Sequence, residues 1–208
     1  MHLLRPGDLP GPAGETYITW RRAVERPLST KALCRALPDL QAERIATWLD
    51  AVQGAPVGRA AMVLERVLSE APRAEVPAIV LADAALAQAL GWDHLFPLMA
   101  PGLKRADLQK RGDDLRRACH RAFVSTAVEV VRLAADLARR ATHLKAVAPK
   151  LRAKSAETAV AMFLTQDAVA PAALPLPDRA ARRLCDRLVT LGAICELTGR
   201  DTFRLYGM

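Results

Sequence analysis

The sequence feature that most constrains the fold is a stretch of 36 residues, from Asp113 to Ala148, that contains neither proline nor glycine. Within it, apolar and small side chains recur every three or four positions, which is the spacing of one face of an α-helix. These residues are Leu115, Cys119, Ala122, Thr126, Val130, Leu133, Leu137, Ala141, Leu144 and Ala148. Asp113 and Asp114 suit the N-terminal end of a helix dipole, and Pro149 ends or bends the helix. We therefore expect a helix of about 54 Å, with a kink or break left open.

The segments before this stretch have the pattern of shorter helices. We expect helices at 15–25, 29–53, 57–70 and 75–91. Ser29 is a candidate cap, Pro38 splits the second segment into two helices, and Gly91 ends the last. Aromatic residues make up only 4% of the chain, and its apolar residues are mostly Ala, Leu and Val, a composition that favours helix. The sequence therefore predicts a mainly α-helical body.

The last part of the chain, residues 155–208, has a different organisation. Ser155 can cap a helix, and one further helical turn precedes two prolines. A third helix over 178–191 begins at or beside Asp178, where an acidic residue is favourable. Its buried side is expected to hold Leu184, Leu188 and Leu191.

A short hairpin is expected to follow this third helix. Gly192 ends the helix, and two strand candidates, AICEL and TFRLY, flank the turn TGRD. In that turn Gly199 supplies the positive φ that a tight turn requires. Helix, short helix, helix and hairpin in this order are typical of a winged helix-turn-helix.

The exposed side of the helix over 178–191 is rich in arginine. Arg179, Arg182 and Asp186 lie opposite the leucines, with Arg183 beside them. In a winged helix-turn-helix this helix enters the DNA major groove and the wing contacts adjacent backbone. Arginine can read guanine and can hold phosphate, whereas Asp186 either reads cytosine or pairs with Arg182. We predict nucleic-acid contacts for these arginines, with a protein contact or a structural role as the alternative.

The positive charge of the chain is concentrated in its middle. The net charge is +8, made up of −1 for residues 1–99, +9 for 100–154 and 0 for 155–208. A localised basic region suggests an anionic partner, nucleic acid first and a membrane surface second. The end of this region is expected to contact DNA phosphates independently of sequence, unless it is only the solvated end of the long helix. This cluster comprises Arg139, Arg140, Lys145, Lys150, Arg152 and Lys154.

Four segments of the chain resemble a known family. They are PGDLPGPAGETYITWRR, LADAALAQALGW, HLKAVAPKLRAK and DRAARRLCDRLVTLGAICELTGRDTFRLYGM. Through nearly all of its length the chain resembles Domain of Unknown Function 1403, an uncharacterised family of alphaproteobacterial proteins common in rhizobia. The resemblance implies a bacterial, cytosolic origin and no established activity. Because family members have more sequence before RPGDLPGPAG, it also implies that an N-terminal part of the family fold is missing here.

A second resemblance concerns the hairpin alone. The segment LGAICELTGRDTFRLY is similar to the wing of bacterial winged-helix modules, including those at the C-terminus of Fic-type adenylyltransferases. The resemblance implies that Gly199 and Arg200 form the wing tip and that Arg204 is a basic residue of a wing strand. The Fic catalytic pattern, a histidine followed by a Gly-Asn-Gly-Arg loop, is absent, so that activity does not carry over.

Catalytic motifs are not found in the sequence. There is no P-loop, H-E-x-x-H or G-x-S-x-G pattern. Asp113 and His120 share one helical face and, with Asp83 and His94, could form a metal or hydrolytic site. The alternative is that the aspartate starts a helix and the histidine lies near a core. No stretch of about 18 apolar residues would span a membrane, and no cofactor is expected.

The predictions combine into one hypothesis with two rivals. The four cysteines are far apart and form no C-x-x-C pattern, so we expect reduced, buried thiols in a cytoplasmic protein. We expect a helical domain over 1–154 and a winged helix-turn-helix over 155–208 that binds duplex DNA, with a regulatory role left open. The first rival is a helical adaptor whose winged helix binds a protein. The second is an enzyme that uses the region of Asp113 and His120.

Overall fold

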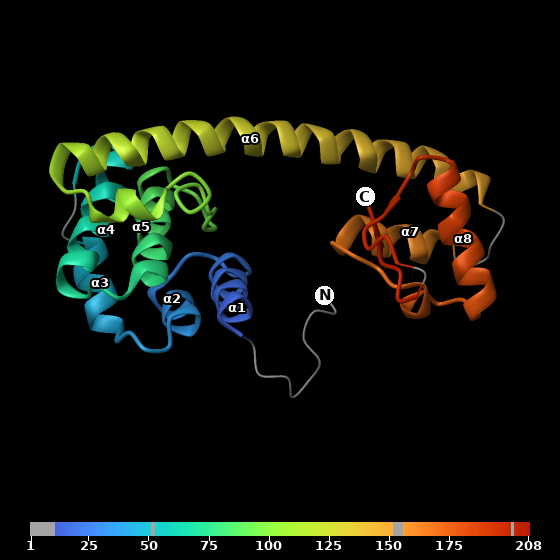
Figure 1. Ribbon diagram of the computed structural model, residues 1–208, viewed down its shortest axis with the longest axis horizontal. Helices are drawn as coiled ribbons and strands as arrows, with labels where there is room; N and C mark the ends of the chain where they lie inside the picture. The colour runs from blue at the N-terminus through green and yellow to red at the C-terminus, as the bar shows by residue number, and fades with distance from the viewer. Residues whose placement is uncertain (1–10, 51–52, 152–155, 201) are drawn as a thin grey trace. The chain divides into compact units, whose positions relative to one another are not determined.

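The structure is a computed structural model that describes residues 11–50, 53–151, 156–200 and 202–208. The fold is mainly α-helical and carries one small antiparallel hairpin near its C-terminus, as the sequence predicts (Figure 1). The chain forms two compact units, Leu9–Val130 and Val131–Met208, which we call the N-terminal unit and the C-terminal unit. The longest helix, α6 (Gly112–Val147), contributes residues to both units.

Five helices and the start of α6 build the N-terminal unit (Figure 1). The five are α1 (Pro12–Val24), α2 (Thr30–Ala36), α3 (Ala42–Asp50), α4 (Pro56–Glu70) and α5 (Glu75–Ala89), and the 3-10 helix η1 (Arg105–Gln109) precedes α6. Helices α4 and α5 pack against each other at the centre of its core, which α2, α3 and the first turns of α6 complete. Every residue of α5 from Val80 to Ala87 is buried, so this part of the helix has no solvent-exposed face.

Three of the expected helix boundaries in this unit are confirmed, whereas α1 begins at Pro12, three residues before its expected start. The hydroxyl of Ser29 accepts a hydrogen bond from the backbone N–H of Ala32 at 3.2 Å and so caps α2. Pro38 lies between α2 and α3. Helix α5 ends before Gly91, which has a φ of +68°, a conformation that glycine adopts without strain.

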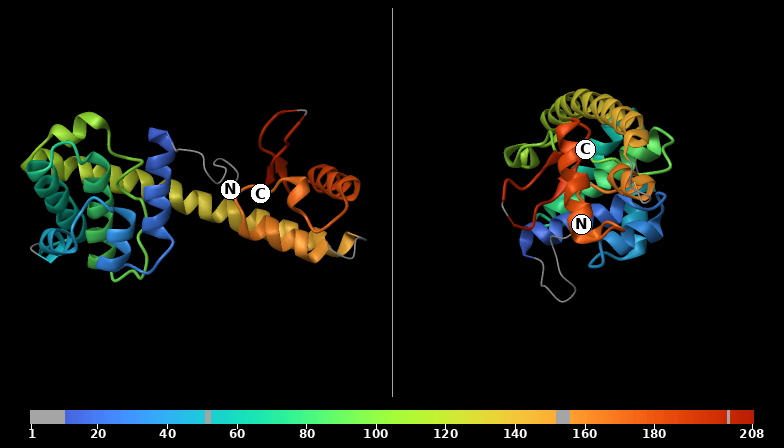
Figure 2. Two further views of the ribbon diagram at one scale, coloured as in Figure 1. Left: turned by 90° about the horizontal axis from the view of Figure 1, so that it is seen from below. Right: turned by 90° about the vertical axis from the view of Figure 1, so that its right-hand side faces the viewer.

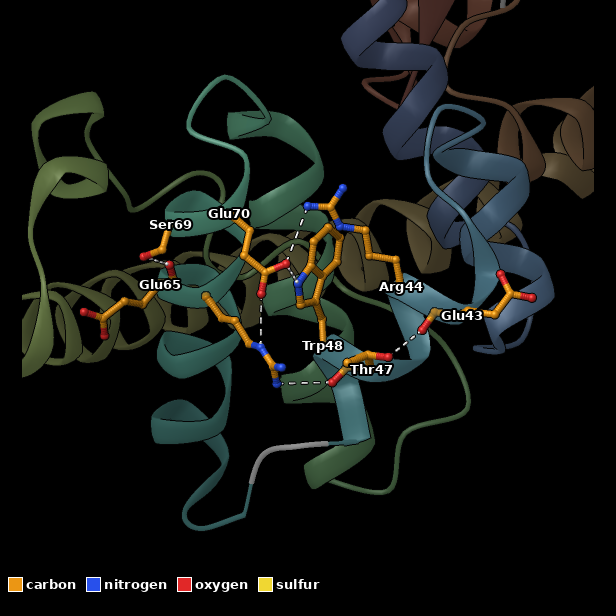
Figure 3. A network of polar contacts seen from close by, with 8 residues as sticks. Glu43, Arg44, Thr47, Trp48, Glu65, Ser69 and Glu70 are labelled. Atoms are coloured by element: carbon orange, nitrogen blue, oxygen red, sulfur yellow. Dashed lines mark hydrogen bonds and ion pairs between the residues drawn. The ribbon is translucent and has the colours of Figure 1, made fainter.

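A polar network joins α3 to α4 at the surface of the N-terminal unit (Figure 3). The buried indole of Trp48 donates from Nε1 to Glu70 Oε2 at 3.0 Å, and the guanidinium of Arg44 lies 4.7 Å from the centre of the Trp48 ring. Arg66 donates to the backbone oxygen of Thr47 at 3.3 Å. The hydrogen bond from Trp48 is the main reason that the pKa of Glu70 lies below its usual value. The network therefore satisfies the one polar atom of a tryptophan that is otherwise in the core.

A buried carboxylate anchors the loop between α5 and η1. Asp83 on α5 is 1% exposed, and its Oδ1 accepts hydrogen bonds from the backbone N–H groups of Leu98 at 3.0 Å and Met99 at 2.8 Å. Its Oδ2 has no partner among the described residues. Burial raises the pKa of Asp83 to about 7, against the effect of the two backbone donors. The loop also passes close to α6, because a Cβ at Gly102 would lie 2.6 Å from the Cα of Ala122.

Helix α6 runs without interruption from Gly112 to Val147, so the break that the sequence left open is not found. The apolar stripe of α6 is not buried along its whole length. Residues of the stripe near both ends are buried, whereas Val130, Leu133 and Leu137 are exposed. The reason is that the core of each unit contacts only one end of α6.

The C-terminal unit consists of the second half of α6 and a compact group of short elements (Figure 2). These are η2 (Ala148–Lys150), α7 (Ala156–Thr165), η3 (Pro171–Ala173), α8 (Asp178–Thr190), β1 (Cys195–Glu196) and β2 (Tyr206–Gly207). Their shared core contains Leu144 of α6, Phe163 of α7 and Leu188 of α8. Because Leu144 and Val147 belong to this core, the C-terminal unit includes part of α6. The expected domain boundary between residues 154 and 155 stays a prediction.

The hairpin is confirmed, but its strands are shorter than the sequence suggests. Cys195 pairs with Gly207 and Glu196 with Tyr206, and Val169 forms an isolated antiparallel bridge to Tyr206 on the other side. Beyond the two strands, the backbone N–H of Leu197 donates to the backbone oxygen of Leu205, so the pairing extends by one residue on each strand.

The four cysteines are free and fall into two classes. Cys119 and Cys185 are buried, and burial is the main cause that raises the pKa of the first to about 12 and of the second to about 11. Cys34 is half-buried and Cys195 is exposed, so the expectation of buried thiols is wrong for Cys195, which lies on β1. Among the described helices, none has both the length and the apolar character of a membrane span.

Candidate functional site

Helix α8 is the best-defined element of the candidate site. It starts directly after Pro177, with Asp178 in its first turn, where a negative charge interacts favourably with the helix dipole. Its buried side is formed by Ala181, Leu184, Cys185 and Leu188. Leu191, expected on that side, is half-buried and lies just beyond the end of the helix. Gly192, with a φ of +66°, follows it as expected.

The exposed side of α8 has two chemically different edges. On one edge, Arg182 is paired with Asp178, with Nη2 and Oδ2 3.2 Å apart. On the other, Arg179, Arg183 and Arg187 are all exposed and have no acidic partner among the described residues. We call these three residues the arginine row. They are spaced four residues apart and so span about 12 Å along the helix.

The edge of α8 that carries Arg182 faces a cavity of about 580 Å³. The other walls are η3 and the hairpin, which contributes Phe203, Arg204 and Tyr206. Asp178 and Asp186 also line it, so two carboxylates accompany the two guanidinium groups there. This edge is therefore close to electrically neutral, whereas the arginine row is wholly positive.

The hairpin loop is held by side-chain hydrogen bonds. The backbone N–H of Leu197 donates to Leu205 O at 2.8 Å, and that of Leu205 donates to Thr198 Oγ1 at 3.3 Å. Arg204 Nε donates to Arg200 O at 3.0 Å and lies 3.8 Å from Glu196 Oε2.

Two of the expected wing residues keep the positions that the sequence suggests. Gly199 has a φ of +57°, as expected for the turn. Arg200 is exposed beside it.

The basic cluster expected over 139–154 is partly neutralised. Arg139 Nη2 lies 2.9 Å from Asp136 Oδ1, and Arg140 Nε lies 2.8 Å from Asp136 Oδ2. Asp136 lies three residues before Arg139 and four before Arg140, about one helical turn away. Lys145 and Lys150 are exposed. Arg152 and Lys154 lie outside the described residues.

The family model described as "Protein of unknown function (DUF1403)" matches residues 1–208. The chain belongs to this family. No curated protein and no solved structure matches the DUF1403 chain.

Two residues of this DUF1403 protein's C-terminal unit were missed from the sequence. Arg187 completes the arginine row, and its spacing of four from Arg183 was the available signal. His143 on α6 has its Nε2 2.9 Å from the backbone oxygen of Leu191 and so joins α6 to the end of α8. That contact links residues 48 positions apart and left no signal in the sequence.

The four residues of the possible metal or hydrolytic site lie in different settings. Asp113 forms an ion pair with Arg116, and Asp83 is buried and accepts hydrogen bonds from the loop backbone. His94 and His120 are exposed. Across the described ranges, no group of three or more His, Cys, Asp or Glu side chains is arranged to hold a metal ion.

Proposed function

We propose that the C-terminal unit binds duplex DNA, with α8 in the major groove and the hairpin against the adjacent backbone. The observation that carries the proposal is the arginine row. Three exposed guanidinium groups on one edge of a short, well-packed helix form a concentrated positive surface. Guanidinium groups in this setting bind phosphate oxygens or the O6 and N7 atoms of guanine.

The order of the elements supports this assignment. Helix α7, the bridge at Val169, the short helix η3, helix α8 and the hairpin follow one another as in a winged helix-turn-helix. In such proteins the helix before the hairpin is the one that reads the major groove. Here that helix is α8, whose apolar side is held by the core and whose arginine row is left exposed.

The remaining basic residues would take supporting roles. Arg200 and Arg204 lie on the hairpin and would contact the sugar-phosphate backbone beside α8. Lys145 and Lys150, together with Arg152 and Lys154, would add phosphate contacts that do not depend on sequence. Arg139 and Arg140 would contribute less, because Asp136 already compensates part of their charge.

Arg182 would have a different task from its neighbours. Its pair with Asp178 places the guanidinium beside the N-terminal part of α8, which is where a recognition helix meets base edges. A fixed arginine beside two acidic residues is suited to selecting a base and is poorly suited to general attraction of phosphate. We therefore assign affinity to the arginine row and sequence preference to the edge with Arg182 and Asp186.

A protein partner is the second candidate function. The cavity beside α8 favours it, because carboxylates, arginines and aromatic rings are mixed there as at a polar protein interface. A protein ligand would engage that cavity and would leave the arginine row without a role.

The test compares three forms of the chain by fluorescence anisotropy on a random-sequence duplex at about 50 to 200 mM salt. We expect wild-type binding to weaken steeply with salt. The variant Arg179→Ala, Arg183→Ala, Arg187→Ala should bind far more weakly, and the slope of log K against log salt should fall by roughly one for each phosphate contact removed. The matched control, Arg22→Ala, Arg26→Ala, Arg35→Ala, removes three exposed arginines of the N-terminal unit that have no acidic partner in the described parts of the chain, and it should bind like wild type.

Two results would contradict the proposal. If wild type shows no salt-dependent binding at micromolar concentration, DNA is not the ligand. If both triple variants lose the same affinity, only the total charge matters and α8 is not the binding element.

A further inference from the structure

Helix α6 carries a row of short apolar side chains that belongs to neither core. At about 100° per residue, the members of this row lie within about 40° of one line along the helix. Between Arg121 and Lys145, no charged residue shares that line. All members are exposed, the three valines by 45–68%. We call this row the outer face; it comprises Val124, Val128, Val131, Ala135, Ala138 and Thr142.

The buried residues of α6 lie on the opposite side of the helix. Leu115, Ala122 and Thr126 are buried in the N-terminal unit, and Leu144 is buried in the C-terminal unit. By the same count, each of them lies about 160–200° from the line of the outer face. The outer face therefore contributes to the core of neither unit and is free to contact another molecule.

The spacing of the outer face is that of a contact between two helices packed along their length. Its members follow one another at intervals of four and three residues, which is the alternation of a coiled-coil seam. From Val124 to Thr142 the face runs for about 27 Å. One edge of it is lined by Ala127, Ala134 and Ala141, so a second helix can approach closely.

The two halves of the outer face differ in size and match each other. The first half has three valines, and the second half has two alanines and a threonine. If two copies of α6 pair antiparallel about a point between Val131 and Ala135, each valine meets a smaller residue of the other copy. Val128 then faces Ala138, and Val131 faces Ala135. In a parallel pair, valine would meet valine and alanine would meet alanine, so one spacing between the helices could not suit both halves.

We propose that the chain forms an antiparallel homodimer through the outer face of α6. Such a contact is isologous, because each copy contributes the same residues about a twofold axis. The proposal does not depend on the DNA binding proposed above. Because the contact is short and its side chains are small, it lies at the lower end of the sizes of specific interfaces, and we expect a dissociation constant in the micromolar range.

Salt should affect this dimer in the opposite direction from DNA binding. In the antiparallel arrangement Arg132, at the edge of the outer face, lies near Arg132 of the other copy. It is exposed and has no acidic partner in the parts of the chain that the structure describes. Salt screens this repulsion and does not weaken apolar contacts, so the dimer should be at least as stable at high salt. Phosphate contacts, in contrast, are lost there.

Sedimentation equilibrium of the full chain at high salt, over concentrations on both sides of the micromolar range, tests the proposal. Wild type should pass from monomer to dimer as its concentration rises. Val131→Asp places a charge in the middle of the outer face and should raise the dissociation constant by more than about tenfold. The matched control, Leu133→Asp, places the same charge on the other side of α6, at a side chain that is 57% exposed, and should dimerise like wild type. Circular dichroism checks that both variants fold.

Cross-linking tests the orientation of the two helices. On the background Cys34→Ser, Cys195→Ser, the two remaining thiols are buried. Val128→Cys and Ala138→Cys are then introduced into separate chains that carry tags of different mass. We expect a short bismaleimide to join the two kinds of chain when they are mixed, and to join neither variant to itself.

The outcomes separate this inference from the proposed function. Wild type that stays monomeric, a dimer that Val131→Asp leaves intact, or a dimer that Leu133→Asp breaks equally would overturn the outer face as the contact. Cross-linking of each variant to itself but not to the other would show a parallel pair and would overturn the antiparallel arrangement. A dimer with these properties that shows no salt-dependent DNA binding would contradict only the proposed function.

Discussion

The buried carboxylate of Asp83 should make the stability of the N-terminal unit depend on pH. The pKa of this group is raised from its ordinary 3.8 to about 7 by burial on α5. The folded chain therefore holds the proton more tightly than the unfolded chain between these two values. By linkage, the free energy of unfolding decreases as the pH rises through this range and is constant above it.

The size of the effect follows from the shift. A difference of about 3 pH units, at 1.36 kcal/mol for each unit, corresponds to roughly 4 kcal/mol in total, of which about 3 kcal/mol falls between pH 5 and pH 8. Asp83→Asn removes the ionisation and keeps an oxygen that can accept the two hydrogen bonds from Leu98 and Met99. The variant should gain stability relative to wild type by about that amount between pH 5 and pH 8.

Urea unfolding followed by tryptophan fluorescence suits this test, because Trp20, Trp48 and Trp92 all lie in the N-terminal unit. The control Asp39→Asn removes one exposed carboxylate from the same unit and should follow the pH dependence of wild type. If the curves of wild type and Asp83→Asn against pH are parallel, Asp83 does not titrate in this range and the reasoning is refuted.

Two further substitutions probe contacts in the two units. Gly207→Ala places a Cβ 2.7 Å from the backbone oxygen of Asp167, which cannot move cheaply, so we expect a loss of about 1–3 kcal/mol and faster amide hydrogen exchange over 193–208. Unchanged exchange in that segment would show that the strand has room for a methyl group. Trp48→Phe removes the hydrogen bond to Glu70 and leaves a small cavity, so we expect a loss of about 1–3 kcal/mol in urea unfolding, whereas Glu70→Gln keeps an acceptor and should lose less. Equal losses in the two variants would contradict the role of that hydrogen bond.

Local signals in the sequence predicted the helices well. The cap at Ser29, the break at Pro38 and the stop at Gly91 depend only on neighbouring residues, and the structure confirms all three. Periodicity predicted a helix over 113–148 with a kink or break left open, and the structure has the unbroken helix Gly112–Val147. The pattern could not show which turns meet a core. Burial in the middle of α6 depends on packing partners distant in the sequence, and the pattern carries no information about them.

The candidate site was predictable as a surface but not as a set of pairs. The apolar residues of α8 fixed which side is exposed, so Arg179, Arg182 and Arg183 were expected there. The ion pairs could not be predicted, because they depend on side-chain rotamers that residue spacing alone does not determine. Arg182 pairs with Asp178, and Asp136 pairs with two arginines of α6. The backbone conformation of the loop that contains Phe203 likewise depends on side-chain hydrogen bonds that no sequence motif predicts.

The difference in burial among the four cysteines allows site-specific labelling of the chain. Electrophilic reagents that react with thiolates should leave Cys119 and Cys185 unmodified in the folded chain, since both are buried and their pKa values are raised to about 12 and about 11. Each unit then retains one accessible thiol, Cys34 in the N-terminal unit and Cys195 in the C-terminal unit. A spin label or fluorophore on Cys195, with Cys34→Ser as background, would sit on β1 of the hairpin and report its mobility when DNA is added.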